Sequence, residues 1–294
     1  MLYHRERKMT WIVSRTKHRA EPVGAAAALR LIMNFVLETI QVIFLSLWYN
    51  IESFIHLLVP RKKKNITGEV VLITGAGSGI GRLMTKEFAT RGTVLVLWDI
   101  NEEGLKETTK LAKSVGASRA YYFVCDCSNK NEVYRVADQT YKAFLPAMIA
   151  NNHGHLVSIA SSAGLIGVNG LADYCASKFA AVGFAESVGL ELQATGKDGI
   201  KTTIVCPYFI NTGMFDGCQT KWPRLLPILN AENVAKKIIH AVLTDQVYLL
   251  LPKSMYFIAA LKNFLPTKQG ILLGQYLGAF NLMDTFRGRS KKQE

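Results

Sequence analysis

The stretch GEVVLITGAGSGIGRLMTKEFATRG, residues 68–92, decides the fold. It predicts a buried strand over residues 70–73, a glycine-rich turn and then an amphipathic helix. The following TVLVLWDIN, residues 93–101, predicts a second strand that ends at Asp99. Glycine lets the backbone approach a pyrophosphate closely, and the N-terminus of a helix offers N–H donors to it. This order of elements is the context that a dinucleotide-binding fingerprint requires.

Strands and helices alternate along most of the chain, which predicts an α/β fold with a Rossmann-like doubly wound parallel sheet. Asp99 can accept hydrogen bonds from both ribose hydroxyls of adenosine, and its charge would repel a 2′-phosphate. No Lys or Arg lies at residues 76–78 or 100–101 to receive that phosphate. NAD is therefore favoured over NADP as the cofactor. AYYFVCDCS, residues 120–128, predicts a third strand, with Asp126 at its end beside the adenine.

Basic residues gather at the two ends of the chain. The formal net charge is +13, and residues 1–64 carry 11 Lys/Arg against 4 Asp/Glu, while residues 287–294 carry 4 against 1. Both ends flank apolar segments, so this distribution favours an anionic membrane surface, and no nucleic-acid motif supports a nucleic-acid partner. The 5 cysteines form no CxxC pair and the 6 histidines have no metal-ligand spacing. Neither a disulfide framework nor a metal site is predicted.

An apolar stretch precedes the basic run RKKK at residues 61–64. Residues 31–51 provide the length of about 20 residues that a membrane helix needs. Polar side chains fall along one line of this helix: Arg30, Asn34, Glu38, Gln41, Glu52 and His56. A membrane anchor is predicted, and it either spans the bilayer with this stripe against a partner or lies in the interface with the stripe toward water. The basic run then marks the cytosolic side.

Serine, tyrosine and lysine residues in the second half of the chain suggest catalysis. HLVSIASSAG, residues 155–164, predicts a strand ending in serines, and residues 171–193 predict a long helix. Tyr174 and Lys178 are four residues apart, so they share one face of that helix. A nearby ammonium would lower the pKa of the tyrosine by favouring the phenolate, and Ser161 could hydrogen-bond the reacting oxygen. Taken alone, the pair could equally be surface residues of an ordinary helix.

Three motifs together are highly specific: TGAGSGIG at 74–81, SSAG with YCASK within 161–178, and CPYFINTGM at 206–214. They resemble the short-chain dehydrogenase/reductase superfamily. Longer runs, such as IKTTIVCPYFINTGMF at 200–215, resemble its membrane-bound retinol and hydroxysteroid branch. The resemblance covers roughly residues 30–284.

The resemblance implies a role for each matching residue. Ser161, Tyr174 and Lys178 match the catalytic serine, the general acid/base, and the lysine that holds the ribose and tunes the tyrosine. Thr212 matches the residue that fixes the nicotinamide carboxamide. The family usually has Gly after this proline, whereas this chain has Tyr208 after Pro207. The expected cofactor-binding residues are Gly75, Ser78, Gly79, Ile80, Gly81, Asp99, Asp126, Tyr174, Lys178 and Thr212.

One piece of the family pattern is missing. Between the helix after Ser128 and the helix YKAFLPAMI at 141–149, relatives carry a fourth strand ending in Asn-Asn-Ala-Gly and a helix with a catalytic asparagine. Neither is present, and NNHG at 151–154 lies just before the Ser161 strand. Usual element lengths put the loss at about 30–45 residues. We predict a shortened chain, joined near residues 139–140, whose catalysis is impaired or absent because a central strand is lost.

Three regions are predicted: a basic N-terminus and membrane anchor at 1–64, a dinucleotide-binding domain at 65–253, and apolar helices with a basic tail at 254–294. Within them, residues 231–245 predict an amphipathic helix and 246–252 a final strand. Residues 214–229 match the substrate loop by position. The apolar helices could form a lipophilic substrate mouth, a second membrane contact or a dimer surface, and an ordinary core helix remains open for the first of them.

Three functions stay open at this point. The first is NAD-dependent oxidation of a lipophilic alcohol, most simply all-trans-retinol to retinaldehyde. The second is the same chemistry on a steroid or another carbonyl compound. The third is a catalytically inactive membrane protein that binds intact relatives. The resemblance implies the endoplasmic reticulum membrane with a cytosolic catalytic domain, lipid droplets as another site, and a homo-oligomer as a possible assembly.

Overall fold

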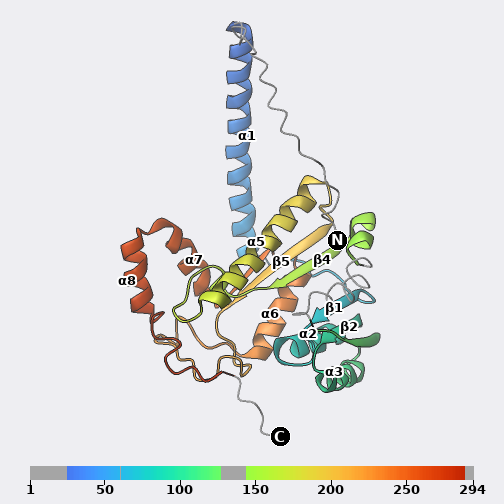
Figure 1. Cartoon of the computed structure of the whole chain (residues 1–294). Coiled ribbons are helices and arrows are strands. Elements are labelled where there is room, and N and C mark those ends of the chain that lie inside the picture. Colours follow the sequence, from blue (N-terminus) through green and yellow to red (C-terminus); the bar gives the residue numbers. More distant parts are fainter. Residues whose placement is uncertain (1–24, 60, 127–143, 289–294) are drawn as a thin grey trace, which may run out of the picture. The chain divides into compact units, whose positions relative to one another are not determined.

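The computed structural model describes residues 25–59, 61–126 and 144–288 (Figure 1). The chain divides into two units, one up to Arg61 and the other from Lys62. The described part of the first unit is helix α1 (Ala25–Leu58). Its segment Leu29–Ile55 has a mean hydropathy of 1.8, is not buried, and is long and apolar enough to cross a membrane. The predicted anchor is thus a single continuous helix.

The second unit begins with the elements that the glycine-rich stretch predicted. They are β1 (Val70–Thr74), α2 (Gly79–Ala89), β2 (Val94–Asp99), α3 (Glu102–Ser114) and β3 (Arg119–Val124). The three strands form a parallel sheet in the order β1-β2-β3. The third strand is shorter than predicted, since it ends at Val124, two residues before Asp126.

The second half of the unit carries another three-stranded parallel sheet, in the order β4-β5-β6. Its elements are β4 (Gly154–Ile159), a 3-10 turn at Ser162–Gly164, α5 (Ala172–Ala194), β5 (Ile200–Pro207), α6 (Ala231–Leu243) and β6 (Tyr248–Leu251). Helices α7 (Ser254–Phe264) and α8 (Thr267–Leu277) follow. The strand predicted within residues 155–164 is present but ends at Ile159, just before the serines, where the chain turns.

The two sheets are not joined by hydrogen bonds within the described residues, so β1 and β4 are edge strands of separate sheets. Residues 144–151, just before β4, are helical. The predicted junction near residues 139–140 lies outside the described part of the chain.

Two hydrophobic cores hold the unit together. The larger one joins both halves, because α6 packs against α2, and its side chains include Leu97, Phe88, Val205 and Ile238. The second core lies under α5, α7 and α8 and includes Val182, Ile204, Met255 and Leu277. Helix α6 therefore links the halves that lack a shared strand pair.

A polar network fastens the start of the domain to the N-terminal edge of the second sheet. The N–H of Lys64 donates to Leu243 O at 2.8 Å, and its Nζ lies 2.7 Å from both Asp245 Oδ1 and His155 Nδ1. Thr203 Oγ1 donates to a backbone carbonyl, so it accepts from His155 Nε2–H at 2.8 Å. Both ring nitrogens of the neutral His155 are thus satisfied. Burial, followed by the charge of Lys64, lowers its pKa to about 4.

Candidate active site

The turn after β1 is shaped by glycine. Gly75 has φ +68°, in the left-handed region that favours glycine. A Cβ on Gly81 would lie 2.1 Å from Gly75 O, so the first turn of α2 can approach β1 only without a side chain there. The N-cap residue Ser78 makes no side-chain cap. The first N–H groups of α2 therefore remain suited to an anion such as a pyrophosphate.

Asp99, at the end of β2, holds this turn in place. Its Oδ2 accepts from Gly77 N–H at 2.9 Å, and its Oδ1 accepts from Asn101 N–H at 2.9 Å. Sequence reasoning assigned Asp99 to the adenosine ribose but did not foresee these two backbone bonds. The carboxylate also lines the cavity described below.

Arg82 is a cation close to the turn that the sequence analysis did not single out. Its Nη2 donates to Gly77 O at 2.7 Å and pairs with Glu107 at 2.9 Å, and its Nε donates to Thr108 Oγ1 at 3.0 Å. The guanidinium is thus committed to protein partners. Arg82 lies on α2, whereas Glu107 and Thr108 lie on α3. No spacing within a single helix could have predicted these contacts, which arise from the packing of α2 on α3.

Ser161, Tyr174 and Lys178 come together at the ends of β4 and β5. Ser161 is buried, accepts from Ala163 N–H at 3.2 Å and donates to Pro207 O at 3.4 Å, and it lies close enough to the Tyr174 side chain to act on its pKa. Lys178 Nζ lies 5.6 Å from the centre of the Tyr174 ring and donates to Ile159 O at 3.1 Å. The three side chains therefore lie close together in the structure.

The electrostatics of this group differ from expectation. Burial raises the pKa of Tyr174, and the hydrogen bond from Ser161 opposes that rise only in part. Burial also lowers the pKa of Lys178. The predicted lowering of the tyrosine pKa by the ammonium is therefore not found in this structure, where burial of the phenol raises that pKa instead.

One cavity of about 330 Å³ contains both groups of residues. The predicted residues that line it are Gly75, Ser78, Gly79, Ile80, Gly81, Asp99, Ser161, Tyr174, Lys178 and Thr212. Thr212 comes from the second half of the unit, and its side chain would lie 3.9 Å from a Cβ on Gly79. Asp126 is not among the lining residues. A glycine cradle at one end and a hydroxyl-rich end at the other fit a dinucleotide.

Aromatic side chains form the other wall of the cavity, and sequence reasoning did not identify any of them as a lining residue. Phe215 meets Tyr174 edge-on at 5.7 Å and Phe209 at 5.0 Å, and Tyr208 and Leu282 also line the space. Phe215 lies within the predicted substrate loop, whereas nothing in the sequence pointed to Leu282. Among the described residues, no group of three or more His, Cys, Asp or Glu could hold a metal ion.

Comparison with known families agrees with this geometry. The family described as short chain dehydrogenase matches residues 69–143 and 139–221. The chain belongs to the short-chain dehydrogenase family. It is accordingly an oxidoreductase of the class that uses a nicotinamide dinucleotide.

Two curated relatives of this family and one solved structure are similar over most of the chain. Human epidermal retinol dehydrogenase 2 is 50% identical over 308 residues, covering 88% of this chain and 100% of the relative. Human estradiol 17-beta-dehydrogenase 11 is 39% identical over 280 residues, covering 80% and 92%. A short-chain dehydrogenase from Burkholderia phymatum, solved with NAD, has a TM-score of 0.59 at 22% identity, covering 79% and 99%. That last similarity shows the fold.

Proposed function

We propose that this chain is a membrane-attached, NAD-dependent oxidoreductase of a lipophilic alcohol, with all-trans-retinol as substrate and retinaldehyde as product, and that an internal deletion reduces its activity. One observation carries the proposal. The glycine turn and the Ser161–Tyr174–Lys178 group line the same cavity.

The chain's own residues suit proton transfer to and from an alcohol. Tyr174 is the general acid/base that takes the hydroxyl proton of the alcohol, and Ser161 positions the oxygen by a hydrogen bond. Lys178 is the cation that faces the tyrosine ring, and it would also reach the nicotinamide ribose. A bound nicotinamide dinucleotide would supply the acceptor for the hydride that leaves the carbinol carbon.

NAD rather than NADP is supported at the end of β2. Asp99 presents a negative charge at the cavity, which disfavours a 2′-phosphate. Arg82, a cation at the same turn, is already held by Glu107, Thr108 and backbone carbonyls. Neither residue leaves a charge suited to that phosphate.

The substrate assignment draws on two observations. The relatives above are named for a retinoid and a steroid, both lipophilic. The cavity wall next to Tyr174 carries Phe209, Phe215 and Leu282, which suit an apolar substrate. Retinol is preferred because the similarity to the retinol dehydrogenase is higher.

The proposed deletion has three supports. The family matches in two segments that meet at residues 139–143. The alignment with the human retinol dehydrogenase spans 308 residues, more than the 294 of this chain, so the relative carries residues that have no counterpart here. The described strands form two sheets with no strand between β1 and β4. A catalytic group displaced by even ~1 Å can lose a hundredfold in rate.

The location that fits this function is the endoplasmic reticulum membrane, or the surface of a lipid droplet, with the domain in the cytosol. Helix α1 has the length and hydropathy of an anchor. The basic run at residues 61–64 follows it directly. Positive residues on the cytosolic side would place the dinucleotide cavity where cytosolic NAD is present.

The raised pKa of Tyr174 favours a second function. A raised pKa keeps Tyr174 protonated at neutral pH, which suits the donation of a proton to a carbonyl. Reduction of a steroid or another lipophilic carbonyl compound is therefore the alternative. An inactive chain that binds intact relatives is a third, since its fold would survive the loss of turnover.

Titration with NAD followed by retinol turnover on membranes separates these functions. The full chain is compared with its Tyr174→Phe variant and with an intact relative. We expect NAD binding in both forms of this chain and slow, Tyr174-dependent turnover. Turnover equal to that of the intact relative would contradict the proposed impairment. Absence of NAD binding would leave only the third function, an inactive chain that binds intact relatives.

The cofactor choice has its own test. Asp99→Ser removes the charge that would repel a 2′-phosphate, so binding of NADP should improve relative to NAD. Asn101→Ala is the matched control, because it changes the neighbouring turn without removing a charge. An unchanged NAD/NADP ratio in Asp99→Ser contradicts the assignment.

A further inference from the structure

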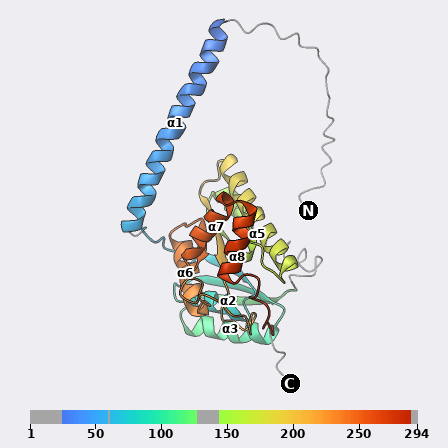
Figure 2. The same cartoon turned by 90° about the vertical axis from the view of Figure 1, so that its left-hand side faces the viewer.

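The helices after β6 expose large apolar side chains to solvent. Phe257 and Phe264 on α7 are 70% and 84% exposed, and Leu272 on α8 is 66% exposed. The opposite sides of these helices bury Met255 and Leu277 in the core. Figure 2 shows α7 and α8 side by side on one face of the domain. The exposed side chains therefore lie on the outer sides of α7 and α8, while the inner sides of these helices pack normally in the core.

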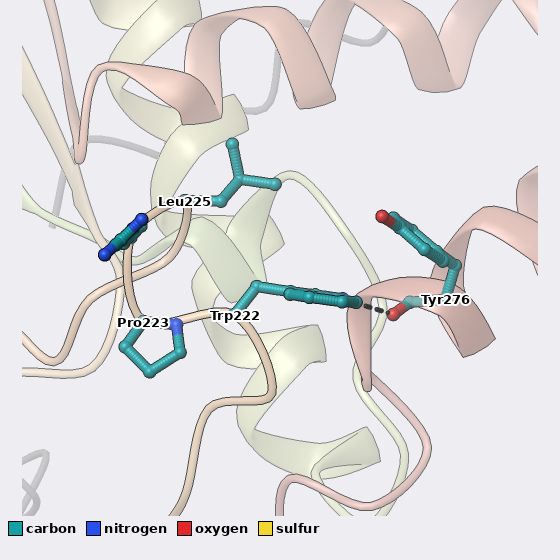
Figure 3. A pocket seen from close by; sticks show the side chains of 5 residues that line it. Trp222, Pro223, Leu225 and Tyr276 are labelled. Atoms are coloured by element: carbon teal, nitrogen blue, oxygen red, sulfur yellow. Dashed lines mark hydrogen bonds between the residues drawn. The ribbon is translucent and has the colours of Figure 1, made fainter.

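A loop from the substrate-binding region joins the same face. Trp222 Nε1 donates to Tyr276 O at 2.8 Å (Figure 3), and the centres of the two rings lie 5.3 Å apart. Lys221 Nζ lies 5.8 Å from the centre of each ring. Ser254 Oγ donates to Leu225 O at 2.6 Å at the start of α7. The α7–α8 surface is defined here as Trp222, Leu225, Phe257, Phe264, Leu272 and Tyr276.

The chain segments that form this surface carry charges of one sign. Residues 217–231 contain no Asp or Glu, and residues 246–283 contain none either. The same segments carry Lys221, Arg224, Lys253, Lys262 and Lys268. A second copy of this face would bring like charges together, whereas an anionic lipid surface complements them. Aromatic rings beside basic side chains are typical of a membrane interface.

The chain connection also favours a membrane. Only residues 59–63 separate the end of α1 from Lys64, which is fastened to the domain. An extended chain spans at most ~3.6 Å per residue, so a membrane-attached α1 keeps the domain close to the bilayer. A lipid surface is then the partner present at the highest effective concentration.

We propose that the α7–α8 surface is a second membrane-binding site, which inserts its aromatic and aliphatic side chains into the interface of an anionic bilayer. The site is separate from helix α1 and needs no turnover. Its occupant is lipid: acyl chains for the apolar side chains and acidic headgroups for Arg224 and Lys268.

Photo-crosslinking tests the proposal on the full chain. The protein is reconstituted in nanodiscs of phosphatidylcholine and phosphatidylserine that include a phospholipid with a diazirine in its acyl chain. Labelled peptides are mapped after illumination. We expect label in α7, α8 and α1, and none in α3. Label confined to α1 overturns the proposal.

Paired variants sharpen the test. Phe264→Ser/Leu272→Ser should reduce label in α7 and α8 by about tenfold or more, because two large apolar side chains can no longer be buried in the bilayer. The matched control is Phe184→Ser/Leu190→Ser on α5, where the side chains are also exposed. Equal loss in both pairs contradicts a specific surface. Thermal unfolding of each variant establishes that its fold is retained.

Two further experiments test the choice of anionic lipid and the alternative of a dimer. Arg224→Glu/Lys268→Glu should lower the label in anionic nanodiscs to the level seen with phosphatidylcholine alone. No change on reversal overturns the choice of anionic lipid. A benzophenone side chain at position 264 should crosslink to lipid, and crosslinking between two copies instead would assign this surface to a dimer.

Discussion

The two halves of the dinucleotide-binding unit are covered differently. The β4–β6 sheet is packed on both faces, by α6 on one side and by α5, α7 and α8 on the other. The β1–β3 sheet is packed by α2 and α3 on one face, and among the described residues its other face carries only a small cluster around Trp98 and Cys125. Tyr121 and Phe123 on that face are each 49% exposed. Trp98 Nε1 is buried and has no hydrogen-bond partner in the described structure.

This difference indicates which part of the fold the loss of a strand and a helix would affect. Parallel sheets normally bury both faces under helices. The first sheet keeps its glycine turn intact, because that turn is held by contacts within the first half, from Asp99 on β2 and from Arg82 between α2 and α3. The second sheet keeps Ser161, Tyr174 and Lys178 together for the same local reason. What depends on the proposed deletion is the spacing between the two groups.

The largest expected effect comes from restoring the segment. Inserting the corresponding residues of the human retinol dehydrogenase between Gln139 and Thr140 should raise retinol turnover at least about a hundredfold, because the catalytic group returns to its position beside the cofactor. A Gly/Ser insertion of equal length is the control and should give no gain. Turnover that is equal before and after restoration would show that the halves are already correctly spaced.

The second effect depends on pH and belongs to the well-packed half. His155 is 10% exposed and faces Lys64, Asp245, Thr203 and Lys201. Its pKa is about 4 when folded against 6.5 as the ordinary value. The unfolded chain therefore binds a proton first as pH falls, so unfolding free energy should drop by about 2 kcal/mol between pH 6.5 and 4.

Denaturant unfolding at several pH values measures this loss. His155→Gln lacks the titrating ring, so its unfolding free energy should vary less with pH across that window, although it is lower throughout. A His153→Gln variant is the control, because that ring is exposed and pairs only with Glu69. Equal pH dependence in all three chains would contradict the role of His155.

A smaller effect is expected where the halves meet. Ile238 on α6 is fully buried in the core that includes α2. Ile238→Val should lower the unfolding free energy by about 1 kcal/mol while both halves still unfold in one transition. With the other three tryptophans replaced by Phe, the fluorescence of Trp98 in the first half and far-ultraviolet circular dichroism should give the same midpoint. Two separate midpoints would mean that α6 does not couple the halves.

The smallest effect is expected on the less covered face. Phe123→Ser should change the unfolding free energy by less than about 0.5 kcal/mol, because its side chain is half exposed to solvent. The buried Leu97 on the neighbouring strand provides the contrast, since Leu97→Ala should cost about 2–5 kcal/mol. A large loss in Phe123→Ser would mean that another part of the chain covers this face.

Local sequence signals predicted much of the fold and site. The glycine turn, the end of β2 and the Tyr174–Lys178 spacing follow from short-range geometry, and the structure brings these residues to one cavity. Contacts distant in sequence were not predictable: Lys64 with His155 and Asp245, Arg82 with Thr108, and Leu282 in the cavity wall. The pKa of Tyr174 was mispredicted because it depends on burial, which spacing does not reveal. Asp126 was assigned to a strand end that the strand does not reach.

The fastening of Lys64 has one more consequence. It lies at the amino-terminal edge of β4 and β6, whereas the cavity lies at the carboxyl ends of the same parallel strands. The segment that leads to α1 therefore joins the domain at the edge of the sheet opposite the cavity. If α1 anchors the chain as proposed, a soluble coenzyme could enter and leave the cavity without meeting the linker to α1, so attachment to a membrane would not hinder cofactor exchange.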